Sequence, residues 1–316
     1  MFQLYKKRNF NELVGDTFTF FKLFGKHYFR SYLIVNGGFV LILLVLVFFL
    51  FKVFYEGTLS GLSNGAAANQ FDSFIAENLS LFLGFGGLSV VLLLVISLIS
   101  YLYPVVYLDL VSRKKDFDTA EIARVVKSKI GKVLLFFILS LFTAIPLIAL
   151  AFMLSFALAF ILIGVPMILI LIPATGSWLS LSFYHYISTD DDYFASLSKA
   201  FQMLKSKFWP IIGSTFVMYL IVQAIVGTIS MVPYIIGIAS VFTTLENPGS
   251  FDPEASNPLS FFVIMMLLTF VLSVLLNFFM QNLLLINNGV IYYSIREESE
   301  NNTPKSDIDL IGTQSE

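Results

Sequence analysis

The feature that most constrains this chain is the run from Val133 to Ile187, whose 55 residues include no Asp, Glu, Lys or Arg. As a single α-helix the run would be about 80 Å long, whereas the hydrocarbon core of a bilayer is about 30 Å thick. The run therefore predicts two membrane spans joined by a tight turn, which we place near Ser155 to Gly164.

The composition of the whole chain indicates the same class. Of its 316 residues, 57% are hydrophobic and 13% are charged, and the mean hydropathy is +0.85. These values are typical of integral membrane proteins. Because the net charge is only -2, we expect no nucleic-acid partner, and the absence of cysteine excludes disulfides and thiolate metal sites. We expect no cleavable signal, because about thirty polar or amphipathic residues precede the first apolar run.

Four further apolar runs are long enough to cross a bilayer. They lie at 31–55, 81–108, 210–242 and 259–295. Together with the two spans of 133–187 they predict an all-α polytopic membrane protein with six transmembrane helices.

Amphipathic segments precede each pair of spans. Asn9 and Glu12 have the spacing of a capping box, and Asp118 and Glu121 repeat it. Apolar residues follow at steps of three and four, which predicts helices lying on the membrane surface. For 113–132 a solvated loop is the alternative. The predicted apolar faces are Phe10, Leu13, Thr17, Phe21, Phe24 and Tyr28; Ile122, Val125, Val126 and Ile130; and Phe194, Leu197, Phe201, Leu204 and Phe208.

This alternation predicts three repeats, each a surface helix followed by a hairpin. Between the spans of the first and third hairpins, acidic segments at 56–80 and 243–258 are expected to form outside loops. The predicted divisions are 1–30 (amphipathic segment), 31–110 (hairpin 1), 111–132 (amphipathic helix), 133–187 (hairpin 2), 188–209 (amphipathic helix), 210–295 (hairpin 3) and 296–316 (disordered tail).

The distribution of basic residues predicts the orientation. Of the 19 Lys and Arg residues, 18 fall in the segments that six spans place on one side, and only Lys52 lies elsewhere. By the positive-inside rule both termini are expected to be cytoplasmic. Residues expected to contact lipid head groups are Lys26, Arg113, Lys114, Lys115, Lys127, Lys129, Lys205 and Lys207.

Few residues offer catalytic chemistry. The two histidines, His27 and His185, are too few for a metal centre built on imidazoles. Asp190 to Asp192 either form an ion or acid–base pair with His185 or complement the N-terminal dipole of the next helix. Asp109 is expected to form an interfacial ion pair with Arg113, one turn away. We expect no catalytic residue, no cofactor and no metal.

The last span carries a set of amides. Asn277, Gln281 and Asn288 lie within about 40° on one helical face. With Gln223 and Asn36 they would line a polar path for a ligand, or they would join helices by hydrogen bonds.

Two groups of short motifs carry a family resemblance. The junctions GKHYFRSYL (25–33), KSKIGKVLLF (127–136) and KSKFWPIIG (205–213) precede spans, and YPVVYLDL (103–110), LSFYHYI (181–187) and VIYYSI (290–295) end them. In these motifs and in its layout the chain resembles a group of bacterial six-span proteins, among them the membrane domain attached to some glycerophosphodiester phosphodiesterases. The resemblance implies a location in a bacterial inner membrane. Some similar proteins are labelled beta-carotene 15,15'-monooxygenase. Membrane enzymes with that activity resemble proteins in which several histidines bind iron, and this chain has only two histidines, so the monooxygenase activity is not predicted. No phosphodiesterase domain is expected here, so that activity is not predicted either.

Three hypotheses for function follow. The first is a non-enzymatic subunit that scaffolds or assists a membrane complex in envelope biogenesis, export or transport, with the bilayer and other membrane proteins as partners. The second is a small-molecule or lipid transporter, which the amides and the Pro and Gly residues within the spans would serve. The third is an enzyme acting on a carotenoid or another lipid.

Overall fold

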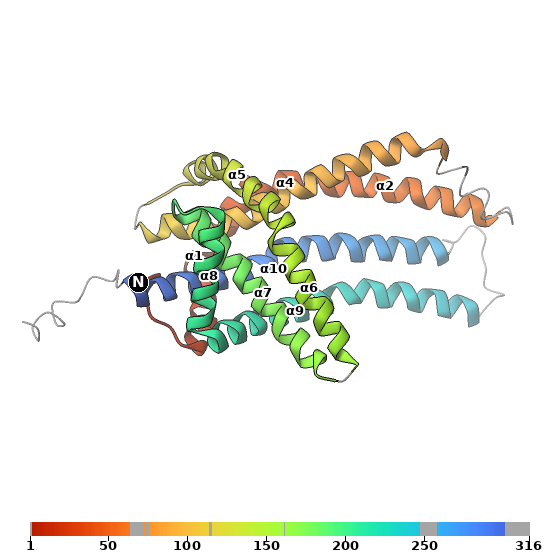
Figure 1. Cartoon of the computed structure of the whole chain (residues 1–316). Coiled ribbons are helices and arrows are strands. Elements are labelled where there is room, and N and C mark those ends of the chain that lie inside the picture. The colour runs from red at the N-terminus through yellow and green to blue at the C-terminus, as the bar shows by residue number, and fades with distance from the viewer. Residues whose placement is uncertain are drawn as a thin grey trace, which may run out of the picture. The chain divides into compact units, whose positions relative to one another are not determined.

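The computed structural model describes residues 2–63, 73, 76–113, 116–160, 162–246 and 258–300. Within these ranges every regular element is a helix (Figure 1), and six helical stretches are long and apolar enough to cross a membrane. The predicted class, an all-α polytopic membrane protein, is confirmed. Residues 64–72, 74 and 75 of the first predicted outside loop, 247–257 of the second, Lys114, Lys115 and the tail beyond Glu300 lie outside the described residues. Residues 56–63 and 243–246, predicted as loop, and 296–300, predicted as disordered tail, are helical instead, because the apolar helices extend past the predicted ends of the spans.

The helices follow one another closely along the chain. They are α1 (Phe10–Tyr32), η1 (Leu33–Gly37), α2 (Gly38–Ser63), α4 (Leu79–Ser112), α5 (Thr119–Phe142), α6 (Ala144–Ala159), α7 (Gly164–Ser188), α8 (Tyr193–Ser206), α9 (Phe208–Glu246) and α10 (Pro258–Glu300).

Two of the predicted surface helices continue into their spans. A single π-helical stretch, η1, joins α1 to α2, and α5 crosses the predicted boundary at 132 without a break. The break in the third span comes later, at Thr143, whose hydroxyl donates to the Leu139 carbonyl at 2.7 Å. Pro146 lies just beyond and has no N–H to donate to the preceding turn, so the helix bends here.

The long uncharged run turns back between Ala159 and Gly164, inside the predicted interval. Leu162 has φ of 62°, in the left-handed region. At Gly164 an added Cβ would lie 1.9 Å from the Ser155 carbonyl oxygen. Only glycine fits at that position, so this residue allows the tight turn that the length of the run requires.

The chain divides into two compact units. Unit 1 comprises the described residues that fall within 1–32, 101–221 and 282–316, and unit 2 comprises those within 33–100 and 222–281. Helices α4, α9 and α10 contribute residues to both units.

The predicted helix caps are present. Asn9 and Glu12 form a complete capping box, in which each backbone N–H donates to the other side chain at 3.0 Å. The Asp118 carboxylate accepts from the Glu121 N–H at 2.8 Å, and the Asp192 carboxylate caps α8 at the Ala195 N–H, 2.7 Å away. These local bonds satisfy N–H groups that a helix start leaves without partners.

In α1 and α5 the amphipathic faces are covered in part by unit 1 itself. Ile122 and Val126 of α5 are buried as predicted, and so are Leu13 and Tyr28 of α1. Phe20 is buried in place of the predicted Phe21. The predicted faces are covered only in part, because Phe10 remains exposed and four other predicted residues are half-buried, namely Phe21, Phe24, Val125 and Ile130.

Helix α8 differs from these two. Its buried residues are Tyr193, Ser196, Ala200, Met203 and Leu204, and it lies against α7, where the Trp178 indole donates to the Leu197 carbonyl at 3.0 Å. The predicted face residues Phe194 and Phe201 remain 62% and 53% exposed. This helix therefore keeps an aromatic surface outside the protein core.

Arg8, which is 2% exposed, anchors the N-terminal segment to the rest of unit 1. Its guanidinium forms an ion pair with Asp16 at 2.8 Å and donates to the carbonyls of Gln3, Leu4 and Lys6, while its backbone N–H donates to the Ser294 hydroxyl at 3.0 Å. Burial lowers the pKa of this guanidinium from its usual value and the bond with Asp16 opposes the shift, so the group stays charged.

Unit 2 is built from apolar spans. Its buried side chains are mainly aliphatic, and the buried polar residues among them are Asn36, Ser89, Ser100 and Ser230. The core residues of this unit include Val40, Leu43, Leu46, Leu92, Ile96, Ile99, Val222, Val226 and Phe278.

Candidate ligand-binding cavity

The core of unit 1 contains hydrogen-bonded amides and tyrosines. The Asn282 side chain is fully buried and accepts from the Tyr28 hydroxyl at 2.7 Å. The Tyr28 carbonyl in turn accepts from the Tyr103 hydroxyl at 2.7 Å. A buried tyrosine needs such a partner for its hydroxyl, so these bonds fix how α1, α4 and α10 meet in this unit.

Asn287 joins three helices. Its amide nitrogen lies 3.0 Å from the Thr17 hydroxyl and 3.2 Å from the Leu13 carbonyl of α1, and it donates to the Ser214 hydroxyl of α9 at 2.9 Å. The Ser214 hydroxyl lies 3.2 Å from the Asn287 carbonyl oxygen as well. Asn287 therefore joins helices by hydrogen bonds, which is one of the two roles considered for the amides of this span.

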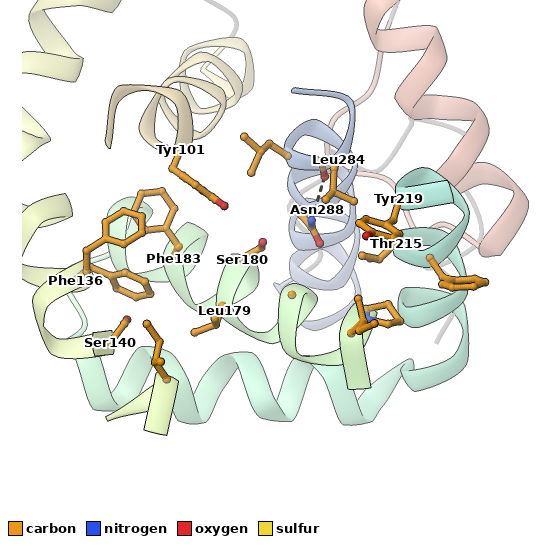
Figure 2. A pocket seen from close by; sticks show the side chains of 17 residues that line it. Tyr101, Phe136, Ser140, Leu179, Ser180, Phe183, Thr215, Tyr219, Leu284 and Asn288 are labelled. Carbon is orange, nitrogen blue, oxygen red and sulfur yellow. Dashed lines mark hydrogen bonds between the residues drawn. The ribbon is translucent and has the colours of Figure 1, made fainter. Parts of the chain in front are cut away.

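A cavity of about 230 Å³ lies in the same unit, between residues of α4, α5, α6, α7, α9 and α10. Phe136, Phe183, Leu179 and Leu284 form part of a mainly apolar wall (Figure 2). No Asp, Glu, Lys or Arg is among the described residues that line it. The polar side chains on the wall are Tyr101, Ser140, Ser180, Thr215, Tyr219 and Asn288.

Asn288 has a buried side-chain atom in the wall without a hydrogen-bond partner. It is 1% exposed, and its amide nitrogen donates to the Leu284 carbonyl of its own helix at 3.0 Å. Its carbonyl oxygen is buried and has no hydrogen-bond partner, whereas Ser140 accepts from the Tyr193 hydroxyl and Thr215 bonds to Ser177. An unpaired buried acceptor is rare and costs about 1–3 kcal/mol.

Asn287 and Asn288 face different surroundings because neighbouring helical residues point about 100° apart. Asn287 faces α1 and α9, and Asn288 lines the cavity. The sequence shows two adjacent amides but does not show which one has a partner. The one available signal for Asn287 was Thr17, a polar residue on a predicted apolar face that needs a hydrogen-bond partner there.

The predicted polar face is divided between the two units. Asn277 and Gln281 line a groove of about 280 Å³ in unit 2, and Asn288 lines the cavity of unit 1. Asn36 is fully buried and donates to the Ser100 hydroxyl at 2.9 Å, while Gln223 is exposed on α9. Of the five, the structure brings only Asn277 and Gln281 together on one wall.

Both histidines have hydrogen-bond partners. His27 Nδ1 lies 2.9 Å from the Tyr107 hydroxyl, and His185 Nε2 lies 2.7 Å from the Asp191 carboxylate. Since Asp192 caps α8, the acidic run serves both roles considered for it, a partner for histidine and a helix start. In the described part of the chain no group of three or more His, Cys, Asp or Glu could hold a metal ion.

The basic residues predicted to meet head groups occupy two kinds of position. Lys26, Lys127 and Lys205 are exposed, and the Arg113 side chain is 60% exposed while it forms the predicted ion pair with Asp109 at 2.7 Å. By contrast, the amines of two lysines are bound within the protein. Lys129 donates to the Ile187 carbonyl, and Lys207 donates to the Arg8 carbonyl and pairs with Glu298.

Comparison with known proteins does not extend these observations. The chain matches no family model, no curated protein and no solved structure, so the family resemblance seen in its motifs stays a prediction.

Proposed function

We propose that this multi-pass membrane protein binds an apolar, lipid-like molecule in the unit 1 cavity and serves in lipid handling or transport. The observation that carries the proposal is the apolar cavity itself, with its mainly aliphatic and aromatic wall. An engineered cavity of about 150 Å³ with a similar lining stays dry and binds benzene, and this one is larger. Ligand sites are commonly concave and apolar with a few polar groups, as here.

The membrane setting is part of the same proposal. With six spans, the basic segments fall on one side, which supports cytoplasmic termini and a bacterial inner membrane as the location. Ile145 and Ile172 line the cavity and remain 47% and 40% exposed, so the cavity is not sealed. A molecule dissolved in the bilayer would enter there without crossing water.

Filling the cavity tests the proposal. Gly176 lies on its wall, and a Cβ added there meets nothing within 4 Å, so Gly176→Leu should occupy the space without disturbing the helix. We expect photolabelling of the purified protein by a diazirine-bearing alkane to fall about fivefold or more at cavity residues. Gly227→Leu is the matched control, because Gly227 also has open space but lies in unit 2. Equal labelling of both variants and the wild type would contradict the proposal.

A second candidate is a non-enzymatic scaffold of a membrane complex, favoured by the aromatic surface of α8. Phe194 and Phe201 are exposed there, where a protein partner or lipid would cover them. Purification in mild detergent should recover defined partners, and Phe194→Ala with Phe201→Ala should release them. Phe142→Ala with Phe156→Ala on α5 and α6, also exposed, should not. If the wild-type protein is recovered without partner proteins, the scaffold function is contradicted.

A further inference from the structure

We infer that the cavity of unit 1 takes a neutral molecule with an apolar chain and one hydrogen-bond donor, such as a long-chain or isoprenoid alcohol. The inference rests on the proposed function and names the ligand class of the same site. It starts from the carbonyl oxygen of Asn288, which lies buried in the cavity wall without a partner (Figure 2).

The free atom of Asn288 defines what it can bind. The amide nitrogen already donates to the Leu284 carbonyl, so the side chain offers the cavity an acceptor. An acceptor is satisfied by an O–H or N–H of the ligand and repels the oxygen of a carboxylate or phosphate. A ligand donor would therefore remove the cost of the unpaired oxygen, and a ligand without one would leave that cost in place.

The rest of the wall excludes anionic ligands. None of its described residues is Lys, Arg or His, so a fatty-acid carboxylate or a phospholipid phosphate would be buried without a countercharge. The hydroxyls of Tyr101 and Tyr219 also belong to the wall and can donate to the oxygen of an alcohol. An alcohol can thus donate to the Asn288 oxygen and accept from a tyrosine hydroxyl. An anion cannot donate to Asn288 and finds no positive charge on the wall.

Water would satisfy the polar groups of the wall but not the apolar remainder. Because the lining is mainly apolar, an alcohol with a hydrocarbon chain removes apolar surface from water there in addition to bonding Asn288. The cavity of about 230 Å³ holds roughly eight groups of the size of a water molecule. It therefore accommodates the hydroxyl end and the first carbons of one chain, and the remainder extends through the unsealed side.

Three matched probes test the ligand class. Each is a hexadecyl chain with a diazirine in mid-chain, and they end in an alcohol, its methyl ether or a carboxylate. For the wild type in neutral detergent we expect labelling of cavity residues by the alcohol to exceed that by the ether about tenfold, as for one hydrogen bond to a buried acceptor. We expect the carboxylate to label no better than the ether.

The variant Asn288→Leu removes the acceptor and should reduce the preference for alcohol over ether to within about twofold while ether labelling persists. Asn277→Leu, the same change at the unit 2 groove of α10, should leave the preference unchanged. If Asn288→Leu does not fold, the ratio of alcohol labelling to ether labelling in the wild type still tests the ligand class.

Each outcome separates the two proposals. Equal wild-type labelling by alcohol and ether, or a preference for the carboxylate, overturns the ligand class and leaves an apolar binding site standing. No cavity labelling by any probe overturns the proposed function together with it.

Discussion

Two asparagines of α10, ten residues apart, show how differently the same side chain is used in the two units. Asn287 of unit 1 is fully buried and bonded to residues of α1 and α9. Asn277 of unit 2 is exposed, and its amide nitrogen donates to the Ser273 carbonyl of its own helix at 2.9 Å. A polar residue within a span therefore stabilises packing only where another helix supplies a partner.

The same contrast holds for the cores of the units. In unit 1, tyrosines and amides form hydrogen bonds between helices, as Tyr184 does by donating to the Leu285 carbonyl at 2.9 Å. In unit 2, the core is mainly aliphatic, and Asn36 is its buried amide. We expect the shape of unit 1 to depend on specific bonds and that of unit 2 on apolar packing, which the following substitutions test.

The largest effect is expected at Asn287. Asn287→Leu removes the bonds to Thr17, Leu13 and Ser214 and leaves buried polar groups without partners, at a cost of about 3 kcal/mol of unfolding free energy. Both tryptophans, Trp178 and Trp209, lie in unit 1, so their fluorescence during heating in mild detergent reports on this unit. Asn277→Leu should change the midpoint of thermal unfolding little. Similar losses in both variants would remove the distinction between the units.

An intermediate effect is expected at Gly289. A Cβ there would lie 2.2 Å from Leu108 Cδ1 and 2.6 Å from the Tyr184 hydroxyl, so Gly289→Ala forces these side chains or α10 itself to shift in unit 1. We expect a loss of about 2 kcal/mol, seen as a lower midpoint of thermal unfolding. Gly227→Ala in unit 2 meets no atom within 4 Å and should be neutral or slightly stabilising. A stable Gly289→Ala protein would show that this contact is not tight.

The smallest effect is expected at Asn36 of unit 2. Its amide donates to the Ile96 carbonyl at 3.3 Å and the Ser100 hydroxyl at 2.9 Å, but its carbonyl oxygen is buried without a partner. Because Asn36→Leu removes that unpaired oxygen along with the two bonds, the net loss should be about 1 kcal/mol or less. Loss of helical circular dichroism at a midpoint as low as that of Asn287→Leu would mean that unit 2 also depends on its amide.

Local chemistry made much of the fold predictable. The capping box of Asn9 and Glu12, the ion pair of Asp109 and Arg113 and the turn before Gly164 all involve residues close in sequence. The six spans follow from length and hydropathy, because a helix must match the thickness of the bilayer. Such features depend on helical geometry and solvent alone.

The candidate site could not be predicted in the same way. Helical spacing placed Asn277, Gln281 and Asn288 on one face, but that face meets the groove of unit 2 at the first two and the cavity of unit 1 at the third. Periodicity also grouped Phe194, Phe201 and Leu204 on one face of α8, yet Phe194 and Phe201 are exposed, whereas Leu204 is buried. Periodicity shows that a face exists and does not show what covers it.

The amino-acid sequence by itself determined the membrane class, the spans, the caps and the sharp turn of this protein, since each depends on near neighbours and the bilayer. Only the tertiary structure decided which amides have partners and which one is left open in a cavity. Asn287 and Thr17 are 270 residues apart in the chain, and the carbonyl oxygen of Asn288 has no hydrogen-bond partner. Such pairing depends on the arrangement of helices in three dimensions, which no local pattern records.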